Sequence, residues 1–439
     1  MRPRVFYGWV IVAITFVTMG IGVNARTSFS LFFPSIVDEF GWDRGTTAGA
    51  FSFGFIVSAF FSPLIGRMMD RYGPRVVMEF GVLLMAGGLL LAPLTTQPWH
   101  LYLTMGLMVG GGSVCLSYTG QSLYLPNWFI RRRGLAIGIA FAGVGIGSVT
   151  VLPWAGYLIA QSGWRSASTA LGILMLVTLV PINLLVRQRP EQMGLLPDGD
   201  GGVALDPRPS VTIVDPAWVA VDWTLGRALR TARFWWLALG FFCGLYAWYA
   251  VQVHQTKYLV ETGFSANLAV WALGTVSLLG IPGQIVLGHL SDRIGREWIW
   301  SISGLGFAIC FAALIALEYF PNVLLVYVMV LAQGLLGYGV TAVMAAVVVE
   351  IFEGKHYGSI FGTVMLAGLA GGAAGPWLTG ALHDWYGTYT VAFMLGIGLS
   401  MVGSVTIWLA SPRKVRSVAG RSHRLDVVQG REAAATKTL

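Results

Sequence analysis

A single arginine inside the first apolar stretch of this chain has the chemistry to bind an anion. Arg26 follows Tyr7, where that stretch begins, by 19 residues, which is about 28 Å along a helix. An ionisable group within a membrane span is costly and is therefore a functional candidate. Its guanidinium could pair bidentately with a carboxylate; the alternative is an arginine that snorkels to the outer headgroups. At helical spacing it shares one face with Thr15, Met19, Gly22 and Ser30.

Proton coupling has one titratable candidate inside the apolar runs. His254 could change charge near neutral pH, although a histidine near the outer end of a span is also typical of an interface. Lys257, one turn later, could offer a second positive charge to an anion near the outer mouth. All 20 acidic residues fall in loops, tails or near the ends of apolar runs, with Glu79 and Glu350 the most inward.

Further polar and aromatic side chains within the apolar runs could orient a bound molecule. They are Asn24, Tyr118, Gln121, Tyr246, Tyr249, Gln333 and Tyr338. About half of them are expected to pack or cap helices instead, and the spacing does not choose between the two roles.

A ten-residue turn occurs twice, at 66–75 and 288–297, and its charges could hold helix ends together. The glycines, acids and basic residues concerned are Gly66, Asp70, Arg71, Gly73 and Arg75, and Gly288, Asp292, Arg293, Gly295 and Arg296. The carboxylates beside arginines could join the two halves in one conformation and release them in another, while the glycines permit close approach and tight turns. One copy alone could be an ordinary basic loop. Two copies predict two similar halves, as in many transporters.

The elements that position these residues are long apolar helices. The AVILMFWYC residues make up 56% and charged residues 11% of the chain, against about 25% charged in an average soluble protein. This composition indicates a polytopic helical membrane protein, and stretches of about 20 apolar residues each predict a span. The twelve predicted spans are 7–33, 46–66, 76–95, 99–125, 134–160, 166–186, 233–259, 266–288, 298–318, 322–350, 357–382 and 389–410.

A polar break divides these spans into two sets of six. We expect an N-terminal six-helix half at 1–186, a linker at 187–232, a C-terminal six-helix half at 233–410 and a basic tail at 411–439. The linker is rich in proline and aspartate. The tail is short and has no aromatic residue, so we expect it to be disordered rather than an output domain.

The distribution of basic residues predicts the orientation. Both termini lie on one side of an even number of spans, and that side carries all of the 28 Lys and Arg residues except Arg26, Arg44, Arg165 and Lys257. This asymmetry places the termini and the linker in the cytoplasm of a multi-pass plasma membrane protein. The compact length and short loops favour a bacterial inner membrane. The net charge of +8 then reflects topology and contact with anionic membrane lipids rather than a nucleic-acid partner.

The repeated turn resembles the loop between the second and third helices of the major facilitator superfamily and its counterpart between helices eight and nine. The resemblance implies a secondary transporter with twelve transmembrane helices in two pseudo-symmetric halves. A segment at 128–143 with an aromatic pair, a basic triplet and alternating small residues is similar to the fifth-helix entry of monocarboxylate transporters. Gly8 and Trp9 match that group's first-helix opening, and oxalate/formate antiporters fit nearly as well.

The same resemblance bears on the site residues. Monocarboxylate transporters carry a functional lysine in the outer part of their first helix, which Arg26 matches to within about a residue. Their eighth helix carries an aspartate and an arginine before a proline turn, but alignment on Pro282 offers Ser277 and Ile281 here. Gln284 follows and could hydrogen-bond a carboxylate without neutralising it. The missing aspartate favours anion exchange slightly over proton symport.

We therefore predict a secondary transporter of small organic anions that works by alternating access, with protons as a second partner in the symport alternative. The alternative hypotheses are an exporter of drugs or neutral solutes and a sensor with a transporter fold. No phosphate-binding loop, metal-spaced set or catalytic triad is recognisable, so we expect neither an enzyme nor a cofactor. Cys115, Cys243 and Cys310 lie singly in apolar runs and are expected to pack.

Overall fold

The computed structural model describes residues 6–42, 44–199 and 212–418. The basic residues Arg2 and Arg4, the middle of the predicted linker and most of the predicted tail lie outside the described residues.

The N-terminal part is a bundle of long apolar helices. Its elements are α1 (Tyr7–Thr27), α2 (Phe29–Phe40), α3 (Arg44–Leu91), η1 (Ala92–Leu94), α4 (Pro98–Leu101), η2 (Tyr102–Val109), α5 (Gly110–Leu116), α6 (Tyr118–Gln121), η3 (Leu125–Asn127) and α7 (Arg133–Asn183). Short elements follow it: η4 (Pro190–Met193), η5 (Pro197–Gly199), β1 (Thr212–Ile213), α8 (Pro216–Val219) and α9 (Leu225–Ala228).

The C-terminal part repeats this construction. Its elements are α10 (Ala232–Glu261), α11 (Ala266–Ile294), α12 (Arg296–Tyr319), α13 (Val323–Leu331), η6 (Ala332–Gly337), α14 (Gly339–Phe352), α15 (Tyr357–Tyr386), α16 (Thr390–Ala410), η7 (Pro412–Lys414) and β2 (Arg416–Ser417). The segments η2 and η6 are π-helical turns within the fourth and tenth crossings.

The helices cross a membrane twelve times. Ten helical stretches in the described residues are long and apolar enough to span a bilayer, and two of them have 46 and 51 residues. About 20 residues suffice for one crossing, so each of these two crosses twice. They turn back at Gly73 and Gly163, whose φ angles are +79° and +80°. Glycine adopts this left-handed region without the penalty that a side chain adds. The predicted twelve-helix fold is confirmed.

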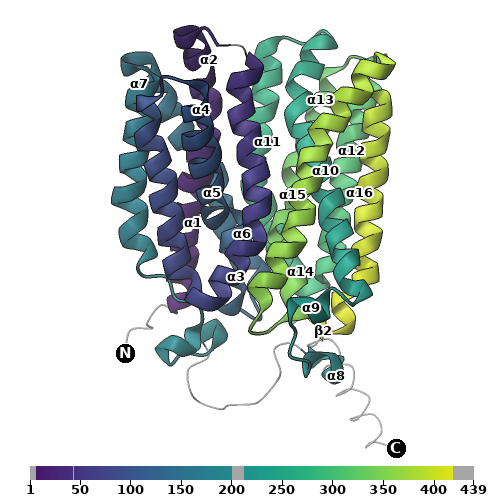
Figure 1. Cartoon of the computed structure of the whole chain (residues 1–439). Helices are drawn as coiled ribbons and strands as arrows, with labels where there is room; N and C mark the ends of the chain where they lie inside the picture. Colours follow the sequence, from purple (N-terminus) through teal and green to yellow (C-terminus); the bar gives the residue numbers. More distant parts are fainter. Residues whose placement is uncertain (1–5, 43, 200–211, 419–439) are drawn as a thin grey trace, which may run out of the picture.

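The two bundles stand side by side, with the start of α1 and the strand β2 at the same end (Figure 1). We call this end the terminal face and the opposite end the outer face. The bundles meet along two helix pairs, because α3 packs against α15 and α7 packs against α11. Within the bundles, α1 packs against α7 and α10 packs against α15, so each lies next to a helix of the boundary.

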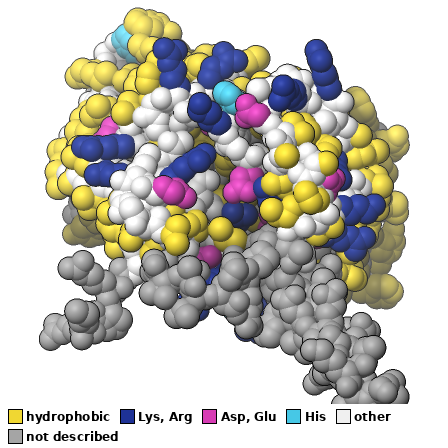
Figure 2. Space-filling model, turned by 90° about the horizontal axis from the view of Figure 1, so that it is seen from below, with side chains coloured by type: hydrophobic (Ala, Val, Ile, Leu, Met, Phe, Trp, Pro, Cys, Tyr) yellow, Lys and Arg dark blue, Asp and Glu magenta, His cyan; other side chains and the backbone are white. Residues whose placement is uncertain are grey.

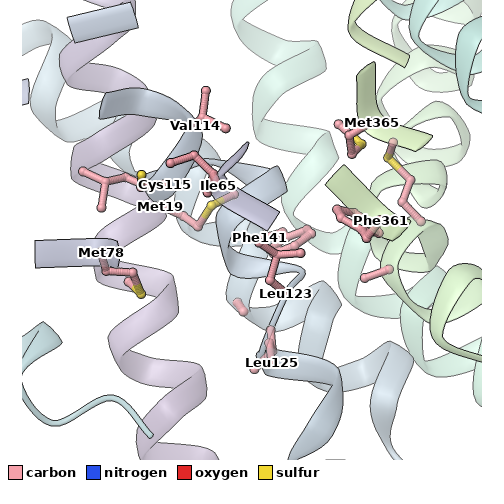
Figure 3. Close-up of a cluster of buried hydrophobic side chains, with 14 of the residues drawn as sticks. Met19, Ile65, Met78, Val114, Cys115, Leu123, Leu125, Phe141, Phe361 and Met365 are labelled. Atoms are coloured by element: carbon pink, nitrogen blue, oxygen red, sulfur yellow. The ribbon is translucent and has the colours of Figure 1, made fainter. Parts of the chain in front are cut away.

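Apolar packing continues across the boundary between the bundles. Figure 3 shows Met19, Ile65 and Phe141 of the N-terminal part, with Phe361 and Met365 of α15 on the far side. All five are buried and belong to one apolar cluster. A second cluster fills the outer part of the C-terminal bundle. Contact between the bundles at the terminal face is therefore both apolar and close.

The ends of the linker and the start of the tail are ordered against the bundles. Asp198 accepts hydrogen bonds from the backbone N–H groups of Ile130 and Arg131, which attaches the first linker segment to the N-terminal bundle. The short strands β1 and β2 pair antiparallel beneath the C-terminal bundle. The start of the tail therefore differs from the disorder expected from 411 onward. Glu297 accepts a bond from the Arg413 N–H, and Arg416 pairs with Glu353.

Candidate substrate-binding site

Arg26 lies between the bundles with part of its guanidinium unpartnered. Its Nη1 donates to Ser113 Oγ at 3.1 Å, and its Cζ lies 4.1 Å from the centroid of the Phe55 ring. Its Nη2 is buried and has no hydrogen-bond partner. Among the described residues it forms no ion pair, and its electrostatic neighbour is the Tyr249 hydroxyl of the opposite bundle. A buried cation without a counter-ion is costly, so this position suits an anion.

Three tyrosines predicted for the site lie near one another, and one of them, Tyr249, neighbours Arg26. Tyr249 of α10 stacks edge-on against Phe55 across the boundary, with ring centroids 6.1 Å apart. Tyr118 and Tyr338 each lie close enough to Tyr249 to interact with it electrostatically. Both bundles thus contribute hydroxyl groups and ring faces to one region, which combines a fixed positive charge with apolar walls.

A pair of glutamines lies one helical turn outward from these tyrosines. Gln333 Nε2 donates to Gln252 Oε1 at 3.3 Å. Gln333 is 2% exposed, and its own Oε1 has no partner. Gln252 was not among the residues singled out from the sequence.

Two predicted site residues are engaged in helix packing. Asn24 Nδ2 donates to the carbonyls of Gly20 and Val144, and its Oδ1 accepts from Ser148. These bonds join α1 to α7 and leave the amide occupied. Gln121 Oε1 likewise accepts from the buried Tyr124 hydroxyl. The geometry favours a structural use for both.

The remaining predicted residues are His254 and Lys257, in the last turns of α10, and the buried Tyr246 and Gln284. His254 Nε2 donates to the Pro376 carbonyl at 2.9 Å and so joins α10 to α15. Lys257 has a side chain 71% exposed and pairs with Glu261, which places its charge on the surface. Tyr246 and Gln284 are buried, the Tyr246 hydroxyl lies beside Thr379, and Gln284 Oε1 has no partner.

The first copy of the repeated turn bonds directly to the opposite bundle. Asp70 accepts hydrogen bonds from the N–H groups of Gly358 and Ser359 and from Ser359 Oγ, at 2.7 to 2.8 Å. These donors begin α15, where the helix dipole also favours a negative charge. Gly66 packs so closely on Gly358 that a Cβ would collide with its carbonyl.

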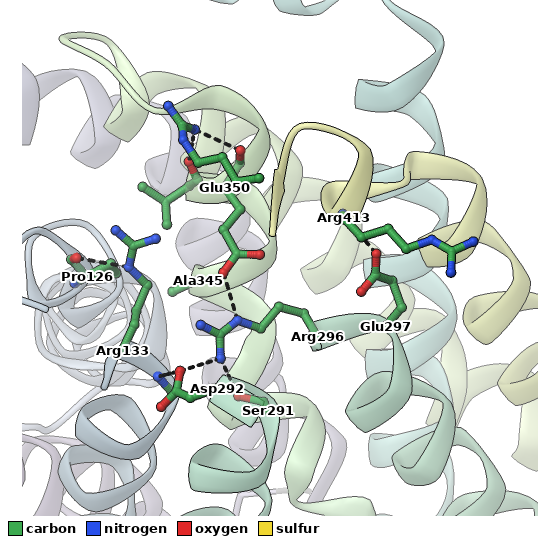
Figure 4. A network of polar contacts seen from close by, with 12 residues as sticks. Pro126, Arg133, Ser291, Asp292, Arg296, Glu297, Ala345, Glu350 and Arg413 are labelled. Carbon is green, nitrogen blue, oxygen red and sulfur yellow. Dashed lines mark hydrogen bonds and ion pairs between the residues drawn. The ribbon is translucent and has the colours of Figure 1, made fainter. Parts of the chain in front are cut away.

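The second copy forms the equivalent contact with an added ion-pair network (Figure 4). Asp292 accepts from the N–H groups of Gly134 and Leu135 at the start of α7, at 2.9 and 3.0 Å. It also pairs with Arg296 at 2.7 Å, and Arg296 pairs with Glu350 at 2.8 Å. All three charged side chains are at least 93% buried. We call the Asp70 and Asp292 contacts the two latches.

Other residues of the two turns face solvent or shape the backbone. Arg71, Arg75 and Arg293 are exposed, and Gly73 and Gly295 have φ angles of +79° and +111°. Figure 2 shows many Lys and Arg side chains on this terminal face. The latches therefore lie under a basic surface and close this end of the boundary between the bundles.

No group of three or more His, Cys, Asp or Glu side chains in the part of the chain that the structure describes could hold a metal ion. The three cysteines are buried and unpaired.

Two six-helix bundles that are joined at one face and have a buried arginine side chain between them are typical of a membrane transport protein. Residues 9–340 and 255–436 match the Major Facilitator Superfamily in sequence. The chain belongs to this superfamily, and it is therefore a transporter rather than an enzyme.

Curated relatives narrow the resemblance to one group. Monocarboxylate transporter 13 of Rattus norvegicus is 28% identical over 411 residues, which cover 91% of this chain and 87% of that protein. Monocarboxylate transporter 11 of Homo sapiens is 27% identical over 428 residues, with 94% and 84% covered. The predicted resemblance to monocarboxylate transporters is confirmed.

Solved structures agree with the fold. The proton:xylose symporter XylE superposes with a TM-score of 0.72 at 16% identity, over 92% of this chain and 95% of that one. The fucose:proton symporter FucP of E. coli gives 0.66 at 15% identity, over 93% and 100%. At these identities the likeness concerns the fold alone.

Proposed function

We propose that this chain transports small monocarboxylates by alternating access, with Arg26 as the group that neutralises the substrate carboxylate. The observation that carries the proposal is the buried Nη2 of Arg26, which has no partner and no carboxylate nearby. A carboxylate accepts paired N–H bonds from a guanidinium, so a monocarboxylate satisfies both the charge and the donor. The names of the curated relatives point to the same substrate class.

The two latches fit one end state of such a cycle. Both tie the bundles together at the terminal face, so a substrate would reach Arg26 from the outer face in this state. Release of Asp70 and Asp292 from the helix starts of α15 and α7 would let the bundles rock and open the terminal face. We propose residues 1–186 and 233–410 as the two moving units, joined by 187–232, with 411–439 as the tail.

We propose anion exchange as the coupling mode. No carboxylate among the described residues neighbours Arg26, so an acidic proton carrier beside the substrate has no support there. The candidate His254 is held by the Pro376 carbonyl, and we expect His254→Gln to retain exchange. Proton symport is the alternative. Uptake driven by a proton gradient would indicate symport, whereas uptake driven by an internal anion would indicate exchange.

The orientation we propose has the terminal face in the cytoplasm of the plasma membrane. The basic residues on that face support it through the positive-inside rule and through attraction to anionic lipids.

Uptake of radiolabelled lactate, pyruvate, formate and oxalate into proteoliposomes tests the proposal. Loss of a buried charged hydrogen bond costs at least ~1.5 kcal/mol, or roughly tenfold in affinity, so Arg26→Gln should lower uptake by tenfold or more. Lys257→Gln removes an exposed positive charge and should match the wild type. Full uptake by Arg26→Gln would refute the assigned role.

A further inference from the structure

We infer that the substrate carries a hydrogen-bond donor at the end opposite its carboxylate, and that Gln333 accepts this bond. The inference rests on the proposed function and assigns Gln333, with Gln252 behind it, as the specificity-determining pair. Chemically, the substrate class is a short ω-hydroxy or similarly donor-bearing monocarboxylate rather than a plain aliphatic acid.

The orientation of the Gln333 amide is set by its neighbour. Because Nε2 of Gln333 donates to Gln252 Oε1, its Oε1 is the free end of the amide. That oxygen is buried and unpartnered. A buried acceptor left without a donor costs about 1–3 kcal/mol, and an incoming O–H or N–H would remove this cost.

The glutamine pair lies about one turn farther along the helices than Tyr249 and Tyr338. Gln252 follows Tyr249 by three residues on α10, so it is displaced roughly 4.5 Å outward along the helix and about 60° around it. Gln333 precedes Tyr338 by five residues through the π-helical η6, which is close to one π-helical turn. Since Tyr249 neighbours both Tyr338 and Arg26, the free oxygen lies about one turn from the guanidinium level.

Local backbone geometry holds Gln333 in this place. η6 brings Gly334 against the backbone of Val276 in α11, and this close packing fixes the neighbouring residue. π-Helical turns of this kind occur frequently at functional sites. A carboxylate at Arg26 and a donor at Gln333 therefore require a molecule with a few methylene groups between the two ends.

The test compares 4-hydroxybutyrate with pentanoate, which replaces the hydroxyl by a methyl group. Wild-type proteoliposomes should prefer the hydroxy acid by roughly tenfold in uptake at limiting concentration. Gln333→Met should remove the preference by slowing uptake of the hydroxy acid relative to that of pentanoate. Gln252→Met removes the acceptor that orients the Gln333 amide, so it should reduce the preference partially.

Thr18→Val provides the matched control, because it removes a buried hydrogen bond to Asn183 away from the site. It should keep the wild-type ratio. Equal uptake of the two acids by the wild type, an unchanged ratio in Gln333→Met, or uptake of neither acid would overturn the inference. If pentanoate uptake depends on Arg26 without any preference for the hydroxyl, the proposed function stands and this inference alone falls.

Discussion

Arg26 is the candidate anion-binding residue because of the partners that it lacks. Arg165, another arginine outside the terminal face, pairs with Glu39 at the outer edge of the N-terminal bundle. Arg26 has a hydroxyl and two aromatic rings as neighbours but no described carboxylate. Cation–π contacts with Phe51 and Phe55 stabilise the guanidinium partially, and the unsatisfied Nη2 is left for a ligand.

At the same scale, the buried Arg296 makes a prediction about stability. Arg296→Met would leave Asp292 and Glu350 buried without their shared cation. Removal of one partner from a buried ion pair costs about 3–5 kcal/mol. We expect the variant to lower the thermal unfolding midpoint clearly in detergent, as followed by tryptophan fluorescence.

Arg75→Met serves as the comparison, since Arg75 is the last residue of the first copy of the turn and is exposed. Exposed charges contribute little, so its midpoint should stay close to that of the wild type. Equal midpoints for the two variants would contradict the structural role of Arg296.

At the scale of elements, the latches depend on helices that touch through glycine. A Cβ at Gly66 or Gly288 would strike the backbone of Gly358 or Gly134, so Gly66→Ala and Gly288→Ala should separate the bundles at the terminal face. A cysteine introduced at Ser122 can report this separation. Ser122 is buried, and its carbonyl accepts a hydrogen bond from the Tyr357 hydroxyl of the opposite bundle. We expect maleimide labelling of Ser122→Cys to become roughly tenfold faster in either alanine variant. This change corresponds to a free energy of opening that is lower by about 1.4 kcal/mol.

The control for this experiment is Gly274→Ala in α11, the helix that also carries Gly288. A Cβ at Gly274 would meet no atom within 4 Å, so labelling should stay at the wild-type rate. Slow labelling in all three variants would mean that the glycine contacts do not hold the face closed.

The ordered linker end gives a second prediction at this scale. Trp218 donates from Nε1 to the Ile351 carbonyl at 2.8 Å and packs against Trp223 and the Arg233 guanidinium. Trp218→Ala should detach this segment and accelerate tryptic cleavage at Arg227, measured by gel electrophoresis. Trp385→Ala, at an exposed position, should cleave at the wild-type rate, and an unchanged rate in both would show that the anchor is dispensable.

The sequence was sufficient to predict the membrane-spanning helices but not the contacts that they make with one another. Each apolar run is long enough to be recognised by itself, so all twelve crossings could be predicted. The π-helical η2 and η6 could not, because they depend on glycine contacts with neighbouring helices. Similarly, Asn24 and Gln333 look alike in sequence. Only contacts with Val144 and Ser148, more than a hundred residues away, show that Asn24 is occupied.

At the scale of the whole molecule, the distribution of charge predicts the direction of insertion. An impermeant maleimide applied to intact cells should label Gln161→Cys, near the outer turn at Gly163, and should not label Arg71→Cys on the terminal face. Both positions are exposed, so they differ in side rather than in accessibility. Labelling of Arg71→Cys in intact cells would invert the proposed topology.

We propose that the transported group is a carboxylate held by Arg26, and a counterflow assay can test this. Proteoliposomes are loaded with unlabelled lactate or with its neutral isostere lactamide, and entry of labelled lactate is measured. We expect internal lactate to accelerate entry in the wild type, lactamide to have no effect, and Arg26→Gln to show no acceleration. Equal acceleration by lactamide, or full acceleration in Arg26→Gln, would contradict the proposal.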